Sequence, residues 1–171
     1  MTDQIMRRPR TASGATGGGL GAPPGAPTIL LAQADPDARA MIRDALLEGT
    51  GPALLQTVAT AEELAEYFGD TGSGPRPALV VVDADLPGGR SAFDTVRELK
   101  RSPRTGRIPV VLMAQHATPE QVGAAYDAGA NTFIARPVTF LALVRLMKVL
   151  TAYWLDAAVL PPEPRPEPNA A

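Results

Sequence analysis

Residues 78–89 read ALVVVDADLPGG, and prolines stand just before this run, at Pro77, and within it, at Pro87. The first half is uniformly apolar and rich in valine, which predicts a short strand that is buried on both faces. Strands of this kind belong to parallel sheets, where ligands bind outside the carboxyl ends of the strands. Asp83 ends the predicted strand, just before a sharp turn. Its carboxylate is therefore the leading candidate for a functional group.

Short apolar runs alternate with segments of helical periodicity along the rest of the chain. We predict strands over 28–32, 53–58, 78–82, 110–113 and 132–134, and helices over 35–48, 60–68, 90–101, 118–128 and 138–160. Several helices carry start signals: Asp35 stands before a proline, Thr60 lies three residues before Glu63, and Thr118 lies three before Gln121. Strands that alternate with helices in this way predict βα units and a parallel sheet.

The two ends of the chain differ in composition from its middle. Residues 1–27 are rich in glycine and proline, and residues 161–171 are rich in proline. Such segments cannot bury enough apolar surface to offset the conformational entropy of the chain. We predict one folded domain over 28–160, between a disordered tail at 1–27 and an extended tail at 161–171.

Composition excludes several classes of function. The chain has no cysteine and one histidine, which excludes disulfides, thiolate catalysis and zinc sites built on cysteine or several histidines. A net charge of -2 argues against nonspecific binding of nucleic acid. Neither a membrane span nor a secretory signal is evident, so we expect a cytoplasmic protein. The glycines of residues 13–21 follow no strand and lack the Gly-Lys-Ser/Thr sequence of a nucleotide-binding loop.

Four landmarks in order resemble those of response-regulator receiver domains, the CheY-like family. They are the five βα units, Asp83 after an all-aliphatic third strand, the sequence Leu86-Pro87-Gly88 behind it, and Arg136-Pro137 after the fifth strand. The resemblance covers about residues 28–158. It implies an α/β, flavodoxin-like (βα)5 fold, a doubly wound parallel sheet with strand order 2-1-3-4-5. It also implies that Asp83 occupies the position that accepts a phosphoryl group from a sensor histidine kinase.

The metal-binding positions that this resemblance implies are altered. Receivers hold Mg²⁺ with two acidic residues after the first strand, with the acceptor aspartate, and with a backbone carbonyl two residues further on. The acidic pair falls here on Gln33 and Ala34, while Asp83 and Asp85 remain. Asp35 follows the lost pair, but its place before a proline favours a helix cap over a metal ligand. We therefore expect weak Mg²⁺ binding, if any, and no other cofactor.

The other family positions are altered as well. The Ser or Thr that contacts the phosphoryl group falls on Ala114, and the family's lysine falls on Arg136. Arginine matches a carboxylate bidentately, so our hypothesis is that Arg136 pairs with Asp83 and holds one conformation; the alternative is that Arg136 faces solvent. Phe133 takes the position of the aromatic switch residue on the fifth strand, although a core role explains it equally well.

The final helix is apolar around most of its circumference, which is more than one sheet face can cover. Receivers commonly self-associate through this region, and residues 141–155 with Leu160-Pro161-Pro162 resemble the stand-alone regulators that partner phytochrome-type kinases. We expect a homodimer through this helix; the alternative is that the tails cover it. The residues assigned to the dimer face are Leu143, Leu146, Met147, Leu150 and Trp154.

Together these observations predict a stand-alone receiver in two-component (phosphorelay) signal transduction. Because only a short tail follows Leu160, it would act through protein contacts, with weak or no Mg²⁺-dependent phosphorylation, and would not be an enzyme. A conventional receiver that is phosphorylated at Asp83 is the first alternative. A remote one is a hydrolase of the haloacid dehalogenase type, with Asp83 and Asp85 as nucleophile and acid, but the further acidic residues of such enzymes are not found.

Overall fold

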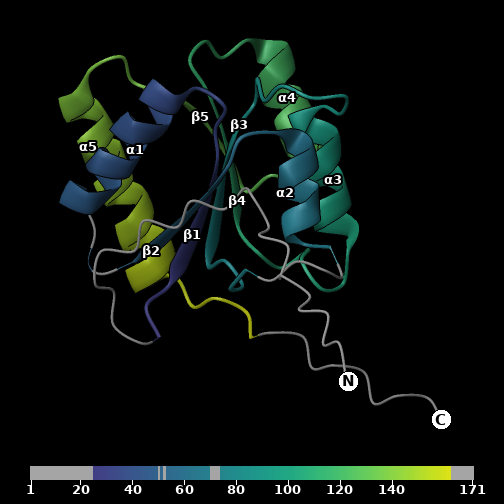
Figure 1. Cartoon of the computed structure of the whole chain (residues 1–171), viewed down its shortest axis with the longest axis horizontal. Coiled ribbons are helices and arrows are strands. Elements are labelled where there is room, and N and C mark those ends of the chain that lie inside the picture. Colours follow the sequence, from purple (N-terminus) through teal and green to yellow (C-terminus); the bar gives the residue numbers. More distant parts are fainter. Residues whose placement is uncertain (1–24, 50, 52, 70–73, 163–171) are drawn as a thin grey trace, which may run out of the picture.

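The computed structural model describes residues 25–49, 51, 53–69 and 74–162. Five parallel strands form one sheet in the order β2-β1-β3-β4-β5, which confirms the predicted flavodoxin-like topology (Figure 1). The strands are β1 (Thr28–Ala32), β2 (Leu54–Val58), β3 (Leu79–Asp83), β4 (Val110–Ala114) and β5 (Thr132–Ala135). Most of the two predicted tails, at 1–24 and 163–171, lies outside the described residues, so the domain boundaries stay a prediction.

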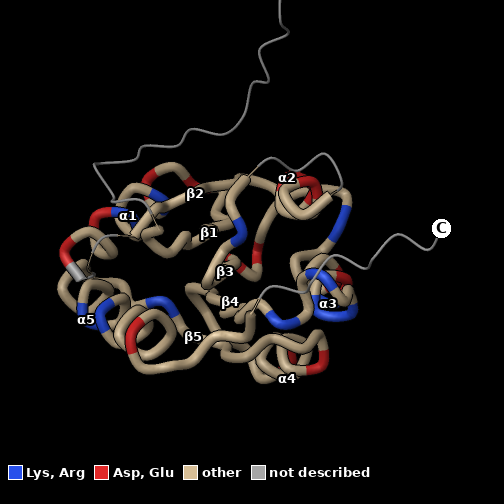
Figure 2. Tube along the Cα trace, turned by 90° about the horizontal axis from the view of Figure 1, so that it is seen from below, with Lys and Arg blue, Asp and Glu red and all other residues tan. Residues whose placement is uncertain are grey.

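The helices form two layers, one on each face of the sheet. One face is covered by α1 (Pro36–Gly49) and α5 (Phe140–Thr151), and the other by α2 (Ala61–Tyr67), α3 (Ala92–Arg101) and α4 (Pro119–Asp127). Figure 2, which looks at the molecule from below, shows the same division. Alternate residues of the strands enter two separate apolar cores, with Val80 and Val82 on the α2–α4 side and Val81 on the α1–α5 side. A strand buried on both faces must be apolar throughout, which explains the valine run.

The predicted start signals act as helix caps. Asp35 Oδ1 accepts a hydrogen bond from the backbone N–H of Asp37 over 2.9 Å, so this residue caps α1 as expected. Thr118 and Gln121 form the reciprocal capping box of α4. At α2 the Thr60 hydroxyl accepts from the Glu63 N–H over 3.1 Å. Helix α3 begins at Ala92, later than the predicted Arg90, because Ser91 is its cap.

The final helix differs from the prediction in length and in orientation. Regular α5 ends at Thr151, and a wider π-helical turn, η1 (Ala152–Ala157), replaces the predicted helical continuation to Leu160. The Thr151 hydroxyl donates to the backbone carbonyl of Met147 over 2.7 Å at the junction. Among the described residues, no helix is both long enough and apolar enough to cross a membrane.

The structure also corrects the assignment of the dimer face on this helix. Leu143, Met147 and Leu150 are buried in the core between α5 and the sheet, and Leu146 and Trp154 pack partly against that core. These side chains pack into the core that α5 shares with α1 and the sheet, so the three buried ones are not available to a partner. The exposed apolar residues of α5 that lie on its other side include Leu141 and Val149.

Candidate functional site

Asp83 lies at the carboxyl end of the sheet, between the ends of β1 and β4. Ala32 of β1 pairs with Val82, and Met113 of β4 pairs with Asp83 itself. The residue that follows β1, Gln33, is therefore the lateral neighbour of Asp83. Asp83 is half-buried, whereas Gln33 is only 4 % exposed. The strand order alone thus places an amide beside the candidate carboxylate.

The Gln33 side chain is held at both of its ends. Its Nε2 donates to Asp83 Oδ2 over 2.5 Å, and its Oε1 accepts from the backbone N–H of Asp35 over 3.0 Å. The backbone N–H of Gln33 donates to the carbonyl of Val58 over 2.9 Å, which continues the β1–β2 ladder. Because an N–H can only donate, the Asp35 bond fixes the amide oxygen on its own side and turns the NH2 group toward Asp83. The orientation of the amide is therefore determined by the backbone.

The second oxygen of Asp83 is also occupied. Oδ1 accepts from the backbone N–H of Asp85 over 2.8 Å, in a turn that a short carboxylate side chain commonly makes with the residue two positions on. Asp85 is exposed, and its own Oδ1 accepts from Gln121 Nε2 of α4 over 3.2 Å. Each oxygen of the candidate carboxylate thus has a donor from within the chain.

Arg136 does not pair with Asp83, which overturns the hypothesis of an arginine clamp. Within the described residues the ion pairs do not include one between these side chains, and the Arg136 guanidinium instead donates to Gln115 Oε1 over 3.3 Å. The Arg136 backbone N–H donates to the carbonyl of Ala114 over 2.7 Å. The side chain lines a hollow of about 200 Å³ with Asp35 and Gln115, between the starts of α1 and α5. Gln33, rather than Arg136, is the partner of Asp83.

The donor set at this edge of the sheet does not fit a magnesium ion. Mg²⁺ requires a near-octahedral set of oxygen ligands, usually with one or two carboxylates. Gln33 presents N–H donors to Asp83 and turns its oxygen away, and Ala34 has no ligand atom. Among the described residues, no three His, Cys, Asp or Glu side chains gather closely enough to hold a metal. Asp83 and Asp85 are left with an amide where the resemblance places carboxylates.

Two further residues lie where the sequence predicts them: Ala114 ends β4, and Phe133 lies within β5. Ala114 is fully buried and has no hydroxyl group. Phe133 is partly buried and packs against the core on the α2–α4 side of the sheet. This packing is what a core residue requires, and a switching role for Phe133 stays a prediction.

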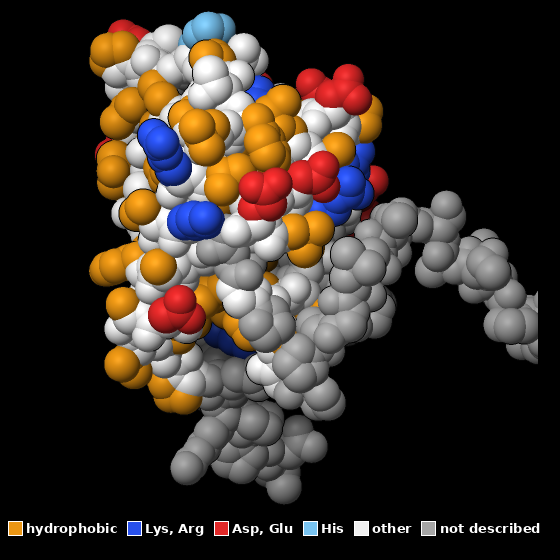
Figure 3. Space-filling view, turned by 90° about the vertical axis from the view of Figure 1, so that its left-hand side faces the viewer, with side chains coloured by type: hydrophobic (Ala, Val, Ile, Leu, Met, Phe, Trp, Pro, Cys, Tyr) orange, Lys and Arg blue, Asp and Glu red, His pale blue; other side chains and the backbone are white. Residues whose placement is uncertain are grey.

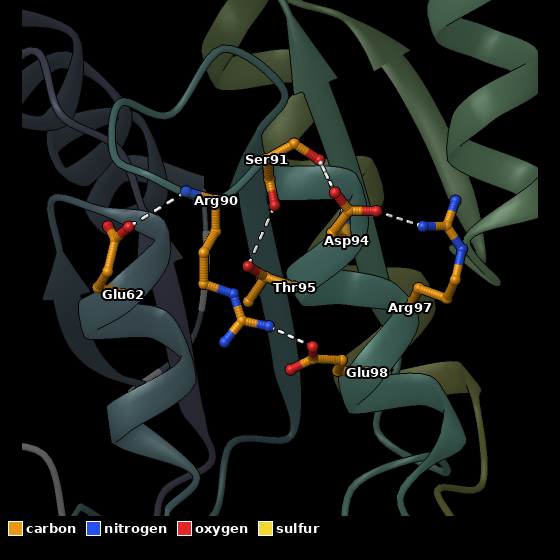
Figure 4. A network of polar contacts seen from close by, with 7 residues as sticks. All are labelled: Glu62, Arg90, Ser91, Asp94, Thr95, Arg97 and Glu98. Carbon is orange, nitrogen blue, oxygen red and sulfur yellow. Dashed lines mark hydrogen bonds and ion pairs between the residues drawn. The ribbon is translucent and has the colours of Figure 1, made fainter.

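The turn that follows Asp83 is tied to α2 through Glu62 (Figure 4). Glu62 Oε1 accepts from the backbone N–H groups of Gly89, over 2.7 Å, and of Arg90, over 3.2 Å. Gly88 has a φ of +138°, and a Cβ there would lie 2.2 Å from Glu62 Oε2. Consecutive backbone N–H groups in such a turn form a concavity that suits an anion. The Glu62 carboxylate fills it.

The pKa of Glu62 lies below its ordinary value of 4.5, because its carboxylate accepts hydrogen bonds from backbone N–H groups. The largest contribution comes from the N–H of Glu62 itself, followed by those of Gly89 and Arg90. Partial desolvation opposes this effect, and a bond from the Thr60 side chain adds to it. The carboxylate is therefore charged throughout the neutral range.

The same turn continues into α3 through a short polar network (Figure 4). The Arg90 guanidinium forms an ion pair with Glu98, and the Thr95 hydroxyl donates to the carbonyl of Ser91 over 3.1 Å. On the next face of the helix, Asp94 pairs with Arg97. These contacts anchor the far end of the turn, so residues 84–91 are held by α2 on one side and by α3 on the other.

Sequence reasoning missed the roles of Gln33 and Glu62. Gln33 was treated as a lost metal ligand, although the order 2-1-3 makes it the neighbour of Asp83, and an amide can donate to a carboxylate while it accepts from the backbone. Glu62 gave no signal beyond its place in the first turn of a helix, because its partners are backbone groups 27 and 28 residues away.

Comparison with known proteins agrees with the fold. The family model described as the response regulator receiver domain matches residues 29–148. The response regulator Rcp1 of Synechocystis sp. is 27% identical over 108 residues, which are 63% of this chain and 73% of that protein.

Two of the similar solved structures come from phytochrome-type systems and their relatives. One is the phosphorylated cyanobacterial phytochrome response regulator RcpA, with 26% identity, a TM-score of 0.73, and coverage of 81% of this chain and 100% of that one. The other is the Mn(2+)-bound form of Rcp1, with 22% identity, a TM-score of 0.70, and coverage of 80% and 99%. The second supports the fold alone. Because the family model spans most of the chain and the fold agrees with it, this protein belongs to the response regulator receiver domain family, a family of signalling domains that interact with histidine kinases in two-component systems.

Proposed function

We propose that this receiver signals through protein contacts, with weak or no Mg²⁺-dependent phosphorylation at Asp83. The observation that carries this proposal is the hydrogen bond from Gln33 Nε2 to Asp83 Oδ2, over 2.5 Å. It supplies the Asp83 carboxylate with a neutral donor on the side where the family places acidic metal ligands. The receiver would then rest in one conformation without a phosphoryl group.

Charge supports the same conclusion. Transfer of a phosphoryl group to a carboxylate brings two anions together, and catalysis of this transfer depends on cationic groups that offset the charge. Arg136 stands at the position of the family's lysine, but its guanidinium donates to Gln115 instead. Both oxygens of Asp83 already accept hydrogen bonds, from Gln33 and from Asp85. Hydrogen bonds to the ionised form stabilise the carboxylate, and a stabilised carboxylate is a weaker nucleophile, which raises the barrier.

The partners of this receiver are other signalling proteins. A sensor histidine kinase is the partner class that the family implies, and a second copy of the chain is the partner that the apolar surface of the final helix favours. Contacts of this kind need no chemistry at Asp83 because a domain held in a single conformation presents the same surface at all times. The proposed output is therefore binding, regulated by the availability of the partner.

Intact mass measurement after incubation with acetyl phosphate and Mg²⁺ tests the state of Asp83. We expect no gain of one phosphate in the wild type, and none in Asp83→Asn. The informative variant combines Gln33→Asp with Ala34→Asp, because it restores carboxylates at the positions of the family's acidic pair. We expect this double variant to gain the phosphate, and to lose it again when Asp83→Asn is added.

The result that contradicts the proposal is a gain of one phosphate in the wild type that Asp83→Asn abolishes. That outcome establishes the conventional alternative, a receiver phosphorylated at Asp83. Binding of beryllofluoride in the presence of Mg²⁺, observed as shifts of backbone amide resonances around residues 83–90, provides a second reading. We expect no shift in the wild type and clear shifts in the variant with the restored acidic pair.

A further inference from the structure

A second hollow lies at the end of the sheet opposite to Asp83. It encloses about 380 Å³ at the amino ends of the three central strands, where Thr28 begins β1, and where Ala78 and Pro109 immediately precede β3 and β4. Leu160 and Pro161 form another part of its wall. In Figure 1 the yellow segment that follows α5 runs below the sheet. The chain therefore returns to this hollow after its last helix.

The wall of the hollow combines prolines with arginines. Five of its lining residues are prolines, and Arg76 and Arg107 supply the charged side chains among those that the structure describes. Arg76 Nη1 donates to the backbone carbonyl of Arg104 over 2.6 Å, which ties the connection before β3 to the connection before β4. Arg107 is exposed, and within the described residues neither of the two lining arginines forms an ion pair. Two guanidinium groups thus line one hollow without a described carboxylate beside them.

The two lining arginines belong to a wider basic region. Arg101 and Arg104 are exposed in the short stretch that leads from the end of α3 to Arg107. Figure 2, which views this edge of the sheet from below, shows basic residues gathered around α3 and the connections next to it. On the side where α1 and α5 lie, hydrophobic side chains predominate and basic ones are scattered (Figure 3). Because the whole chain has a net charge of -2, this concentration of positive charge is local and suits an anionic ligand.

The chain carries a segment of matching chemistry next to the hollow. Residues 163–171 read EPRPEPNAA and begin two positions after Pro161, which lines the hollow. Their alternating prolines favour an extended polyproline helix, which has little conformational entropy to lose on binding. Glu163 and Glu167 stand about 12 Å apart in that conformation, so their carboxylates can reach two separate arginines. With three residues per turn, Arg165 projects from a different side than either glutamate.

We propose that the hollow lined by Arg76 and Arg107 is a binding site for an extended, acidic, proline-rich peptide, and that residues 163–171 of the same chain occupy it. Exposed ion pairs are individually weak. A short tether, however, holds the segment beside the site at an effective concentration in the millimolar range. A weak site is therefore filled by the peptide that is attached next to it. The site goes beyond the proposed function, since it involves neither Asp83 nor a second copy of the chain.

Backbone ¹⁵N relaxation of the full chain tests the proposal at the amides of Arg165 and Glu167. A flexible segment gives order parameters below about 0.6, whereas rigid backbone gives about 0.85. We expect the wild type to lie above about 0.6, and to fall below it in about 1 M salt, where exposed charges are screened. Arg107→Glu should release the segment, and so should Glu163→Lys combined with Glu167→Lys. Joining all three substitutions restores opposite charges, so it should recover part of the order.

Arg145→Glu is the matched control, because it makes the same change of charge at an exposed position of α5 that does not line the hollow. It should leave the order of the segment unchanged. Wild-type order parameters below about 0.6 at low salt overturn the proposal. So does a segment that stays ordered in every charge variant, or one that Arg145→Glu releases as strongly as Arg107→Glu. Order that appears only as the protein concentration rises overturns it too, because the occupant would then come from another copy.

A synthetic peptide of residues 161–171, added to the full chain with Glu163→Lys and Glu167→Lys, examines the site without the tether. We expect the amide resonances of Ala78 and Ile108, which line the hollow, to shift and to saturate at millimolar peptide. Addition of Arg107→Glu to the protein should abolish these shifts. Shifts that persist in that variant, or their absence from the start, contradict the assignment of the site.

The outcome is separate from that of the proposed function. The hollow and Asp83 lie at opposite ends of β3, so Arg107→Glu should not change the mass gained after treatment with acetyl phosphate and Mg²⁺. A flexible 163–171 segment in a protein that is not phosphorylated would overturn the peptide site and leave the proposal about Asp83 standing. An ordered segment in a protein that is phosphorylated at Asp83 would do the reverse.

Discussion

Gln33 follows β1 and Asp83 ends the neighbouring strand β3, and the Gln33 amide donates to the Asp83 carboxylate over 2.5 Å. The same amide accepts from the Asp35 N–H, so it connects the cap of α1 to the end of β3. A neutral hydrogen-bond donor thus stands where the family has negative charge. A hydrogen-bond donor that the chain itself supplies, the Gln33 amide, thus stands where the family would need a dication.

Gln33→Glu should make the protein less stable and sensitive to Mg²⁺. The substitution replaces the donor with a second carboxylate beside Asp83, and the loss of a hydrogen bond to a charged group costs about 1.5–3 kcal/mol. Two carboxylates and a nearby carbonyl form an oxygen-rich site, so Mg²⁺ should recover part of this loss. Urea unfolding with and without Mg²⁺ measures both effects. Gln115→Glu, at an exposed position, is the control and should show neither.

A Mg²⁺-dependent stabilisation of the wild type as large as that of Gln33→Glu would contradict this account, because it would mean that the amide moves aside for the cation.

Protonation of Glu62 should release the turn that follows Asp83. Its pKa is lower in the folded state than its ordinary value of 4.5, so its contribution to stability is fully present above that value. The contribution is lost as the pH falls through the lower, folded pKa. Hydrogen exchange at Gly89 and Arg90 should therefore accelerate in acid beyond the intrinsic pH trend. Glu62→Gln should remove this extra dependence, whereas Glu66→Gln, at an exposed position on the same helix, should keep it.

Gly88→Ala should destabilise the same turn by about 1–3 kcal/mol, because it strains the backbone at a positive φ. The new Cβ would also meet the Glu62 carboxylate. In a Glu62→Ala background this steric part disappears, so the two substitutions together should cost less than the sum of their separate effects. Gly123→Ala is the matched control: nothing lies within 4 Å of its Cβ position in α4, and we expect a gain of about 0.5–1 kcal/mol. Additive costs for Gly88 and Glu62 would contradict the contact.

Most of the fold could be predicted from the sequence because its signals are local. The valine run around Val81 indicates burial on both faces, and the caps Asp35 and Thr118 act through the backbone of the next turn. Strand order came from the resemblance rather than from the residues. The predicted start of a helix was wrong where a single capping side chain sets it, as the Ser91 hydroxyl does for α3.

The site could be predicted in position but not in its contacts. Asp83 lies at the strand end as predicted, since that placement needs only the strand itself. Its partner depends on which strand lies beside β3 and on how an amide divides its donor and acceptor between two neighbours. The rigid fork of Arg136 favoured a pair with Asp83, but its guanidinium donates to Gln115 instead. The chemistry of the side chains favoured Arg136 as the partner of Asp83, but the tertiary structure places Gln33 beside it.

Leu141 and Leu143 lie two residues apart in α5 but differ in burial. Leu143 is fully buried against the sheet, so Leu143→Ala should cost about 2–5 kcal/mol in the free energy of unfolding. Leu141 lies on the exposed side of α5, so Leu141→Ala should cost no more than about 0.5 kcal/mol. Leu141→Ala should nevertheless weaken binding of a second copy of the chain, because it removes apolar area from the exposed side of the final helix. Urea unfolding at a concentration where the chain is monomeric, together with sedimentation at a higher one, separates the two effects. If Leu141→Ala destabilised the monomer as much as Leu143→Ala, Leu141 would belong to the core and not to a surface for a partner.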